Sequence, residues 1–213
     1  MISILKLMKI ILVVSLLGLA SGCSLKKSSS TETSTAPAVS DFVNQDSKTV
    51  MAKTQENLSK AKTESTAWEK DASFVGYNFK VPQDLDPKSL TETFVFGTST
   101  EENFWWTYSI DSQGKIVRAM VLKEDYLGKD LQPIQESFWK KSYVEIIKTA
   151  ESNGGLTFRS QNPEAEITLI LSQTAPNDWL WYVIEYRGAT TSQKIRISAN
   201  DGKVYNEQGT LIK

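Results

Sequence analysis

The sequence predicts an α+β fold of two tandem repeats, each a helix packed on an antiparallel sheet of three to four strands. Helix-like segments precede two groups of short strands, and the turns between strands are too short for crossover helices. The chain also matches itself at an offset of 75 residues, which places 93–96 on 168–171 and 104–108 on 179–183, with Trp106 and Trp181 identical. Whether the two copies form one continuous sheet or two is left open.

The helices are expected at 47–70 and 134–152. In the second segment apolar residues such as Val144, Ile147 and Ala150 approximate the three- and four-residue spacing of a buried stripe. The run 153–155, Asn-Gly-Gly, is a stop signal, because glycine tolerates the left-handed conformation that ends many helices. The first segment has a weaker apolar pattern.

Short apolar runs predict the strands, and their alternation predicts which side faces the helices. The first copy has runs at 74–81, 92–97, 104–110 and 115–123, and the second at 156–159, 166–172, 179–186 and 194–199. Phe94 and Phe96 share one side of their strand, as do Ile167, Leu169 and Leu171, so these sides should pack on the helices. The run 179–186 is apolar on both sides, so it is either sandwiched centrally or presents one side to another domain or partner.

Cys23, the only cysteine of the chain, follows Lys6, Lys9, an apolar run and the small residues Ser21 and Gly22. This arrangement resembles a bacterial lipoprotein signal. The resemblance implies that residues 1–22 are removed and that the Cys23 thiol is acylated, leaving the protein lipid-anchored on the extracytoplasmic side of a membrane. The alternative is an uncleaved membrane anchor, although the apolar run is short for a span of about 20 residues.

Four segments follow from this reading: a signal peptide (1–22), a Ser/Thr-rich disordered tether (23–45), a first repeat (46–130) and a second repeat (131–213). Loss of Lys6 and Lys9 reduces the 24 basic side chains to 22, against 25 acidic ones. Such a mild acidic balance gives no reason to expect nucleic-acid binding, which needs a concentrated basic patch.

The second copy resembles the PepSY domain. The similarity rests on the helical 143–147, the aromatic strand 181–186 and the segment 195–204, which closes on Asp201, Gly202, Lys203 and Val204. The resemblance implies a non-catalytic extracytoplasmic module, associated in that family with regulation of secreted peptidases. It implies no catalytic residues.

Composition argues against an enzyme. The chain has no histidine, so nucleophile systems and metal sites that use histidine are excluded, and no cofactor or metal is expected. Carboxylate pairs such as Glu101 with Glu102, Glu124 with Asp125, and Glu164 with Glu166 are interpreted as solvated turn residues.

The aromatic residues of 104–108 and 179–183 are the remaining candidates for a site, because tryptophan and tyrosine are enriched at interfaces. Most are expected in the core. Trp105 and Tyr182, predicted to face opposite Trp106 and Trp181, are the binding candidates. The leading hypothesis is a membrane-anchored lipoprotein that binds or regulates an extracytoplasmic protein, and the alternative is a carrier of a sugar, lipid or peptide.

Overall fold

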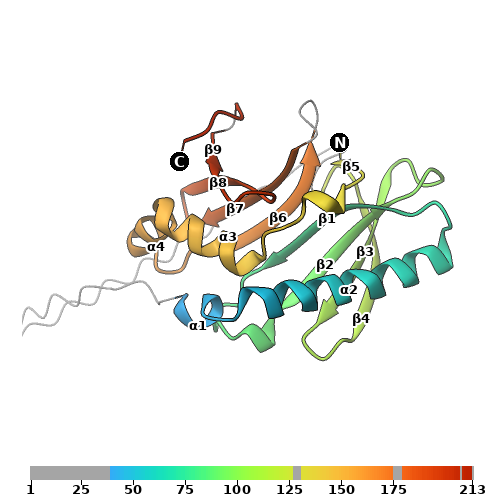
Figure 1. Ribbon diagram of the computed structural model, residues 1–213, viewed down its shortest axis with the longest axis horizontal. Coiled ribbons are helices and arrows are strands. Elements are labelled where there is room, and N and C mark those ends of the chain that lie inside the picture. Colours follow the sequence, from blue (N-terminus) through green and yellow to red (C-terminus); the bar gives the residue numbers. More distant parts are fainter. Residues whose placement is uncertain (1–38, 127–130, 175–178, 207, 213) are drawn as a thin grey trace, which may run out of the picture. The chain divides into compact units, whose positions relative to one another are not determined.

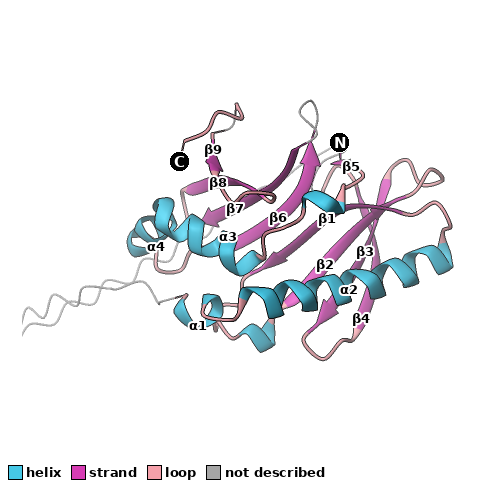
Figure 2. Ribbon diagram, viewed as in Figure 1, coloured by secondary structure: helices cyan, strands magenta, loops and turns pink. Residues whose placement is uncertain are grey.

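The computed structural model describes residues 39–126, 131–174, 179–206 and 208–212. These residues belong to one compact unit of the chain, which contains one continuous antiparallel sheet with helices on one of its faces (Figures 1 and 2). The α+β class is therefore confirmed. Cys23, the signal peptide and most of the predicted tether lie outside the described residues.

Within the described residues the sheet has nine strands, and eight of them follow the order β4-β3-β2-β1-β6-β7-β8-β9, with β5 paired to β6. The strands are β1 (Ser73–Lys80), β2 (Thr91–Gly97), β3 (Phe104–Asp111), β4 (Ile116–Leu122), β5 (Leu131–Gln132), β6 (Glu166–Thr174), β7 (Trp179–Arg187), β8 (Ser192–Ser198) and β9 (Val204–Tyr205). All seven long strands lie where alternation and turn signals predict them. Each observed strand end lies within two residues of the predicted end. The pairing of β1 with β6 joins the two halves into a single sheet.

The helical elements are α1 (Ser40–Val43), α2 (Ser47–Trp68), η1 (Pro87–Ser89), η2 (Glu136–Phe138), α3 (Tyr143–Ala150), the π-helical turn η3 (Glu151–Gly155) and α4 (Leu156–Gln161). Asp46 caps α2 by accepting a hydrogen bond from the Thr49 N–H at 2.8 Å. Ser142 and Glu145 form a capping box at the start of α3. The first helix is thus confirmed, whereas the second begins about nine residues later than predicted.

The expected strand at 156–159 is wrong, because these residues begin α4. Gly154 has a φ of +116°, so the chain leaves the helical conformation near the predicted stop, but it then enters a second helix. A side chain at position 155 would collide with the Tyr186 hydroxyl. A segment of four residues with two apolar side chains does not distinguish a strand from a helical turn. Here the segment forms a helix, and the turn before it packs tightly against β7.

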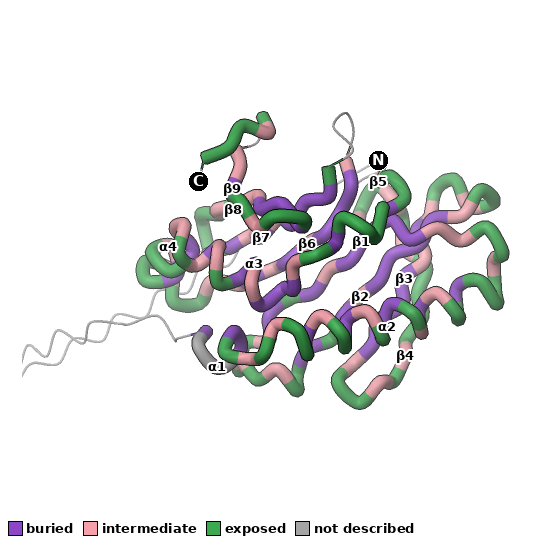
Figure 3. Tube along the Cα trace, viewed as in Figure 1, coloured by how far each residue is buried: buried purple, intermediate pink, exposed green. Residues whose placement is uncertain are grey.

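The main core lies between the helices and the sheet. Phe94, Phe96, Leu169 and Leu171 point into it, as alternation predicts, and α2 packs on β2 and β3 while α3 packs on β7 and β8. Figure 3 shows the buried segments concentrated along the central strands, with β4 largely exposed. The opposite side of the sheet, which we call the helix-free face, holds a smaller buried cluster of Val75, Val95 and Trp105.

The self-match at 75 residues does not preserve the faces of the strands. It holds for β2 and β6, where Phe94 and Leu169 both enter the main core. It fails for β3 and β7, since Trp106 packs on the main core whereas Trp181 pairs with Ser172 on the helix-free face. A one-residue shift reverses every side chain of a strand, which explains the difference. Division of this sheet into two repeats stays a prediction.

Candidate binding surfaces

The two predicted binding residues, Trp105 and Tyr182, are both buried and point to opposite faces of the sheet. Trp105 is 4% exposed and belongs to the small cluster of the helix-free face, with the Lys123 ammonium 4.0 Å from its ring centroid. Tyr182 is fully buried in the main core. The predicted grouping of Trp105 with Tyr182 against Trp106 and Trp181 is therefore corrected: Trp105 shares its face with Trp181, and Tyr182 shares its face with Trp106.

The buried Tyr182 side chain connects the sheet to the segment before α3 through two hydrogen bonds. Its hydroxyl accepts a hydrogen bond from the Trp139 indole N–H and donates one to the Lys141 carbonyl, which ties the segment before α3 to the sheet. Burial raises the pKa of the Tyr182 hydroxyl well above its ordinary value, so it stays neutral. In this conformation neither predicted residue can present its ring to a partner.

The carboxylates interpreted as solvated turn residues lie at or near the surface, and Glu166 pairs with Lys80 there. Among the described residues, no group of three or more His, Cys, Asp or Glu side chains could hold a metal ion. None of the helices in these residues combines the length and the hydropathy that a membrane span requires.

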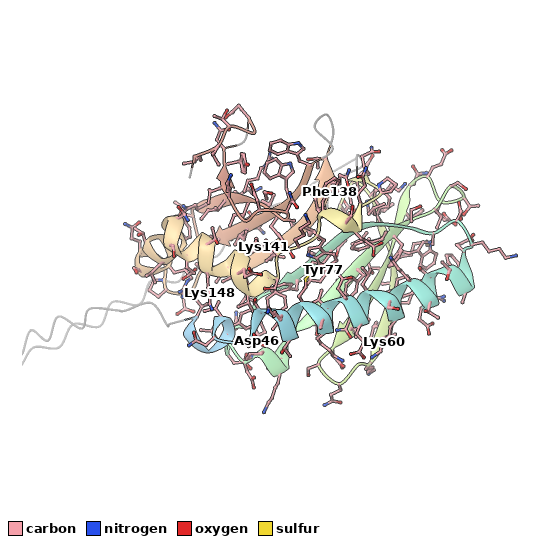
Figure 4. All side chains as sticks on the ribbon, viewed as in Figure 1. Asp46, Lys60, Tyr77, Phe138, Lys141 and Lys148 are labelled. Atoms are coloured by element: carbon pink, nitrogen blue, oxygen red, sulfur yellow. The ribbon has the colours of Figure 1, made fainter. Side chains whose placement is uncertain are left out.

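Glu92 is a buried carboxylate that sequence reasoning missed. It is 5% exposed and accepts hydrogen bonds from Thr54 Oγ1 and the Tyr77 hydroxyl, both at 2.7 Å, and from Asn57 Nδ2 at 2.6 Å. Thr54 and Asn57 belong to α2, and Tyr77, labelled in Figure 4, belongs to β1. The detectable signal was alternation, because Glu92 lies on the same side of its strand as Phe94 and Phe96. Three neutral donors around one carboxylate indicate a fold-stabilising network.

Strand β4 is the most exposed apolar feature of the sheet. Six of its residues, Ile116, Val117, Ala119, Met120, Val121 and Leu122, are apolar. Val117, Met120 and Leu122 are about half exposed, at 54%, 47% and 46%. Strand β4 pairs with β3 on one side only, since it ends the strand order of the described sheet. An edge strand with exposed apolar side chains and unpaired backbone groups is suited to accept a further strand.

Strand β4 has basic residues at both ends and within it, and the acidic residues Glu124 and Asp125 follow directly after Lys123. Lys115 and Lys123 flank the strand and Arg118 lies within it. The Arg118 guanidinium lies 5.2 Å from the ring centroid of Trp68 and 5.5 Å from that of Trp106, and the two rings are in contact. No carboxylate of the described residues forms a salt bridge with these three cations. The edge therefore combines an apolar strand with positive charge.

Comparison with known proteins identifies no family. No family model matches the sequence, and no curated protein matches it. Among solved structures, the crystal structure of a candidate lipoprotein from Clostridium difficile 630 is 13% identical, with a TM-score of 0.46 over 78% of this chain and 96% of that chain. Similarity at this level does not establish a shared fold or function.

Proposed function

We propose that this chain is a lipid-anchored extracytoplasmic protein, acylated at Cys23, whose folded domain is a non-catalytic module that binds another protein through strand β4. The exposed apolar edge of β4 is the observation that carries the proposal. A partner strand added there would satisfy the outer backbone groups of β4 and cover Val117 and Met120. A secreted peptidase is the partner class that the PepSY resemblance favours.

Charge favours a different protein as the partner over a second copy of this chain. If the β4 strands of two copies paired antiparallel with full overlap, centred on Ala119, Lys115 of each copy would lie opposite Lys123 of the other. Like charges directly opposite each other destabilise a pair of antiparallel strands. A partner strand with acidic residues at the matching positions would instead complement Lys115, Arg118 and Lys123.

The test is cross-linking in cells that produce the full chain. We expect a photoreactive amino acid in place of Val117 to form a discrete adduct, and the same group in place of Leu156 to form none. Leu156 is a matched control, because it is apolar and 51% exposed but lies on α4. Adding Met120→Asp should abolish the adduct, because a negative charge on the strand opposes pairing with the proposed acidic partner strand.

Two results would contradict the proposed use of β4. An adduct with the mass of two copies of this chain would show self-association. Equal adducts from positions 117 and 156 would show that the strand has no preference over other exposed apolar positions.

The proposed anchor has its own test, because acylation needs the Cys23 thiol. We expect Cys23→Ser to abolish metabolic labelling by a fatty acid and to move the protein from the membrane fraction to the soluble fraction. The circular dichroism spectrum of the folded domain should be unchanged, because Cys23 precedes residue 39, where the described part of the domain begins. Retention of the unlabelled variant in the membrane fraction would instead support the uncleaved anchor.

A small-ligand carrier is the second candidate function. The feature that favours it is a separate aromatic pocket beside Trp179, on a part of the sheet distant in strand order from β4.

A further inference from the structure

The first strand residues of β7 and the turn after β8 line an open pocket of about 320 Å³. Its lining consists of three aromatic side chains, one aliphatic side chain and three polar ones: Phe138, Trp179, Tyr205, Leu180, Ser198, Asn200 and Asp201. Figure 4 marks Phe138 near the end of β6 and the start of β7. The volume is that of a small-molecule site, in which a few polar groups accompany apolar walls.

Hydrogen bonds hold the walls of this pocket in place without a ligand. The backbone N–H groups of Lys140 and Lys141 both donate to the Ala199 carbonyl at 3.0 Å, which attaches the segment after Phe138 to the turn. Within the turn, Ser198 Oγ accepts from the N–H groups of Asn200 and Asp201, both at 3.3 Å. A preformed site reduces the conformational entropy lost on binding.

The aromatic walls are partly accessible. Trp179 is 45% exposed and Phe138 is 41% exposed. Trp179 and Tyr205 are perpendicular, with ring centroids 5.5 Å apart, and the buried Trp181 contacts both. The rings thus form converging walls instead of the single flat platform on which a sugar ring stacks.

Asp201 is the one carboxylate among the residues that line the pocket. Partial burial acts to raise the pKa of Asp201, but the Lys203 N–H, the Ser198 hydroxyl and the Lys203 charge outweigh it and leave the pKa below its ordinary value. The Lys203 ammonium lies 3.6 Å from Asp201 Oδ2 and its side chain is 56% exposed. Such an exposed ion pair is weak, so a bound cation can displace it.

We propose that this pocket binds a small organic cation of the alkylammonium class, with Trp179, Tyr205 and Phe138 as aromatic walls and Asp201 as the counter-charge. Aromatic faces attract alkylammonium groups through their quadrupole, and this attraction increases when water is excluded. The same aromatic group already accepts one cation, since the Arg196 guanidinium lies 5.5 Å from the Trp181 ring centroid. The inference is independent of strand β4 and rests on the second candidate function.

The experiment titrates the full chain, purified in an uncharged maltoside detergent, with choline chloride at constant ionic strength. Binding is followed by the indole N–H resonances of the six tryptophans in NMR spectra. The matched probe is 3,3-dimethyl-1-butanol, which has the shape of choline but no charge. We expect saturable shifts with choline and about tenfold weaker binding of the neutral probe.

Variants assign the site. Trp179→Ala should abolish the saturable shifts, and Asp201→Asn should weaken choline binding about tenfold while leaving the neutral probe unaffected. Trp68→Ala is the control, because Trp68 is similarly exposed, at 41%, but lies at the end of α2. Equal affinity for the two probes, or no saturable response to choline, would each overturn the proposal. Cross-linking through β4 would be unaffected by any of these results.

Discussion

Replacing Glu92 with alanine is expected to lower the free energy of unfolding by about 3 to 5 kcal/mol. The Glu92 carboxylate is the acceptor for Thr54, Asn57 and Tyr77, and all four residues are buried. Each buried donor left without an acceptor costs about 1–3 kcal/mol, and the truncated side chain leaves a cavity as well. Urea unfolding followed by tryptophan fluorescence measures the loss.

A double-mutant cycle separates this network from general damage to the core. Tyr77→Phe alone should destabilise the protein, because it removes one donor to a buried carboxylate. In the Glu92→Ala background the same change should cost nothing or restore stability, because it removes a donor that has lost its acceptor. Glu102→Ala, at an exposed loop position, should change stability by less than about 0.5 kcal/mol. Additive effects of Tyr77→Phe and Glu92→Ala would show that the network is not the source of the stability.

Removal of Glu151 is the second large effect that we expect, again about 3 to 5 kcal/mol. Arg159 on α4 is 4% exposed, and its Nη2 lies 2.6 Å from Glu151 Oε2. The Tyr186 hydroxyl on β7 donates to Glu151 Oε1 at 2.8 Å, so one carboxylate joins α4 to the sheet. Glu151→Ala would leave the buried Arg159 cation without this carboxylate, which costs far more than the pair itself contributes.

Replacing both charged residues tests that reasoning. The double variant Glu151→Leu with Arg159→Met should recover most of the stability lost in Glu151→Ala, because no charge remains buried. The surface pair of Lys80 and Glu166 is the control, since both side chains are at least 41% exposed. Glu166→Ala should cost less than about 1 kcal/mol. A double variant as unstable as Glu151→Ala would show that packing, not the buried charge, accounts for the loss.

Local patterns predicted most of the fold. The strands were found because alternation and turn residues are short-range signals, and the core side of β2 and β6 followed from the same period. The helix predicted at 47–70 corresponds to α2, which begins at the predicted residue and ends at Trp68. The segment 156–159 was not predicted correctly, because four residues that alternate between apolar and polar side chains fit a helical turn as well as a strand.

The candidate sites were less predictable. Trp105 and Tyr182 were predicted as binding residues from their residue type. Their burial depends on residues far away in the sequence, such as Trp139, which contacts Tyr182. The aromatic pocket was partly visible, since Trp179 was among the aromatic candidates, whereas Phe138, Asp201 and Tyr205 come together only through the turn after β8.

The sequence by itself determined the α+β class, the lack of histidine and the presence of one cysteine, Cys23. These properties depend on composition and on residues close together in the chain. Only the tertiary structure decided that β1 pairs with β6, that β4 is an edge, that Glu92 is surrounded by donors and that Trp179 lines a pocket. Each of these depends on contacts between segments tens of residues apart, which strand periodicity does not specify.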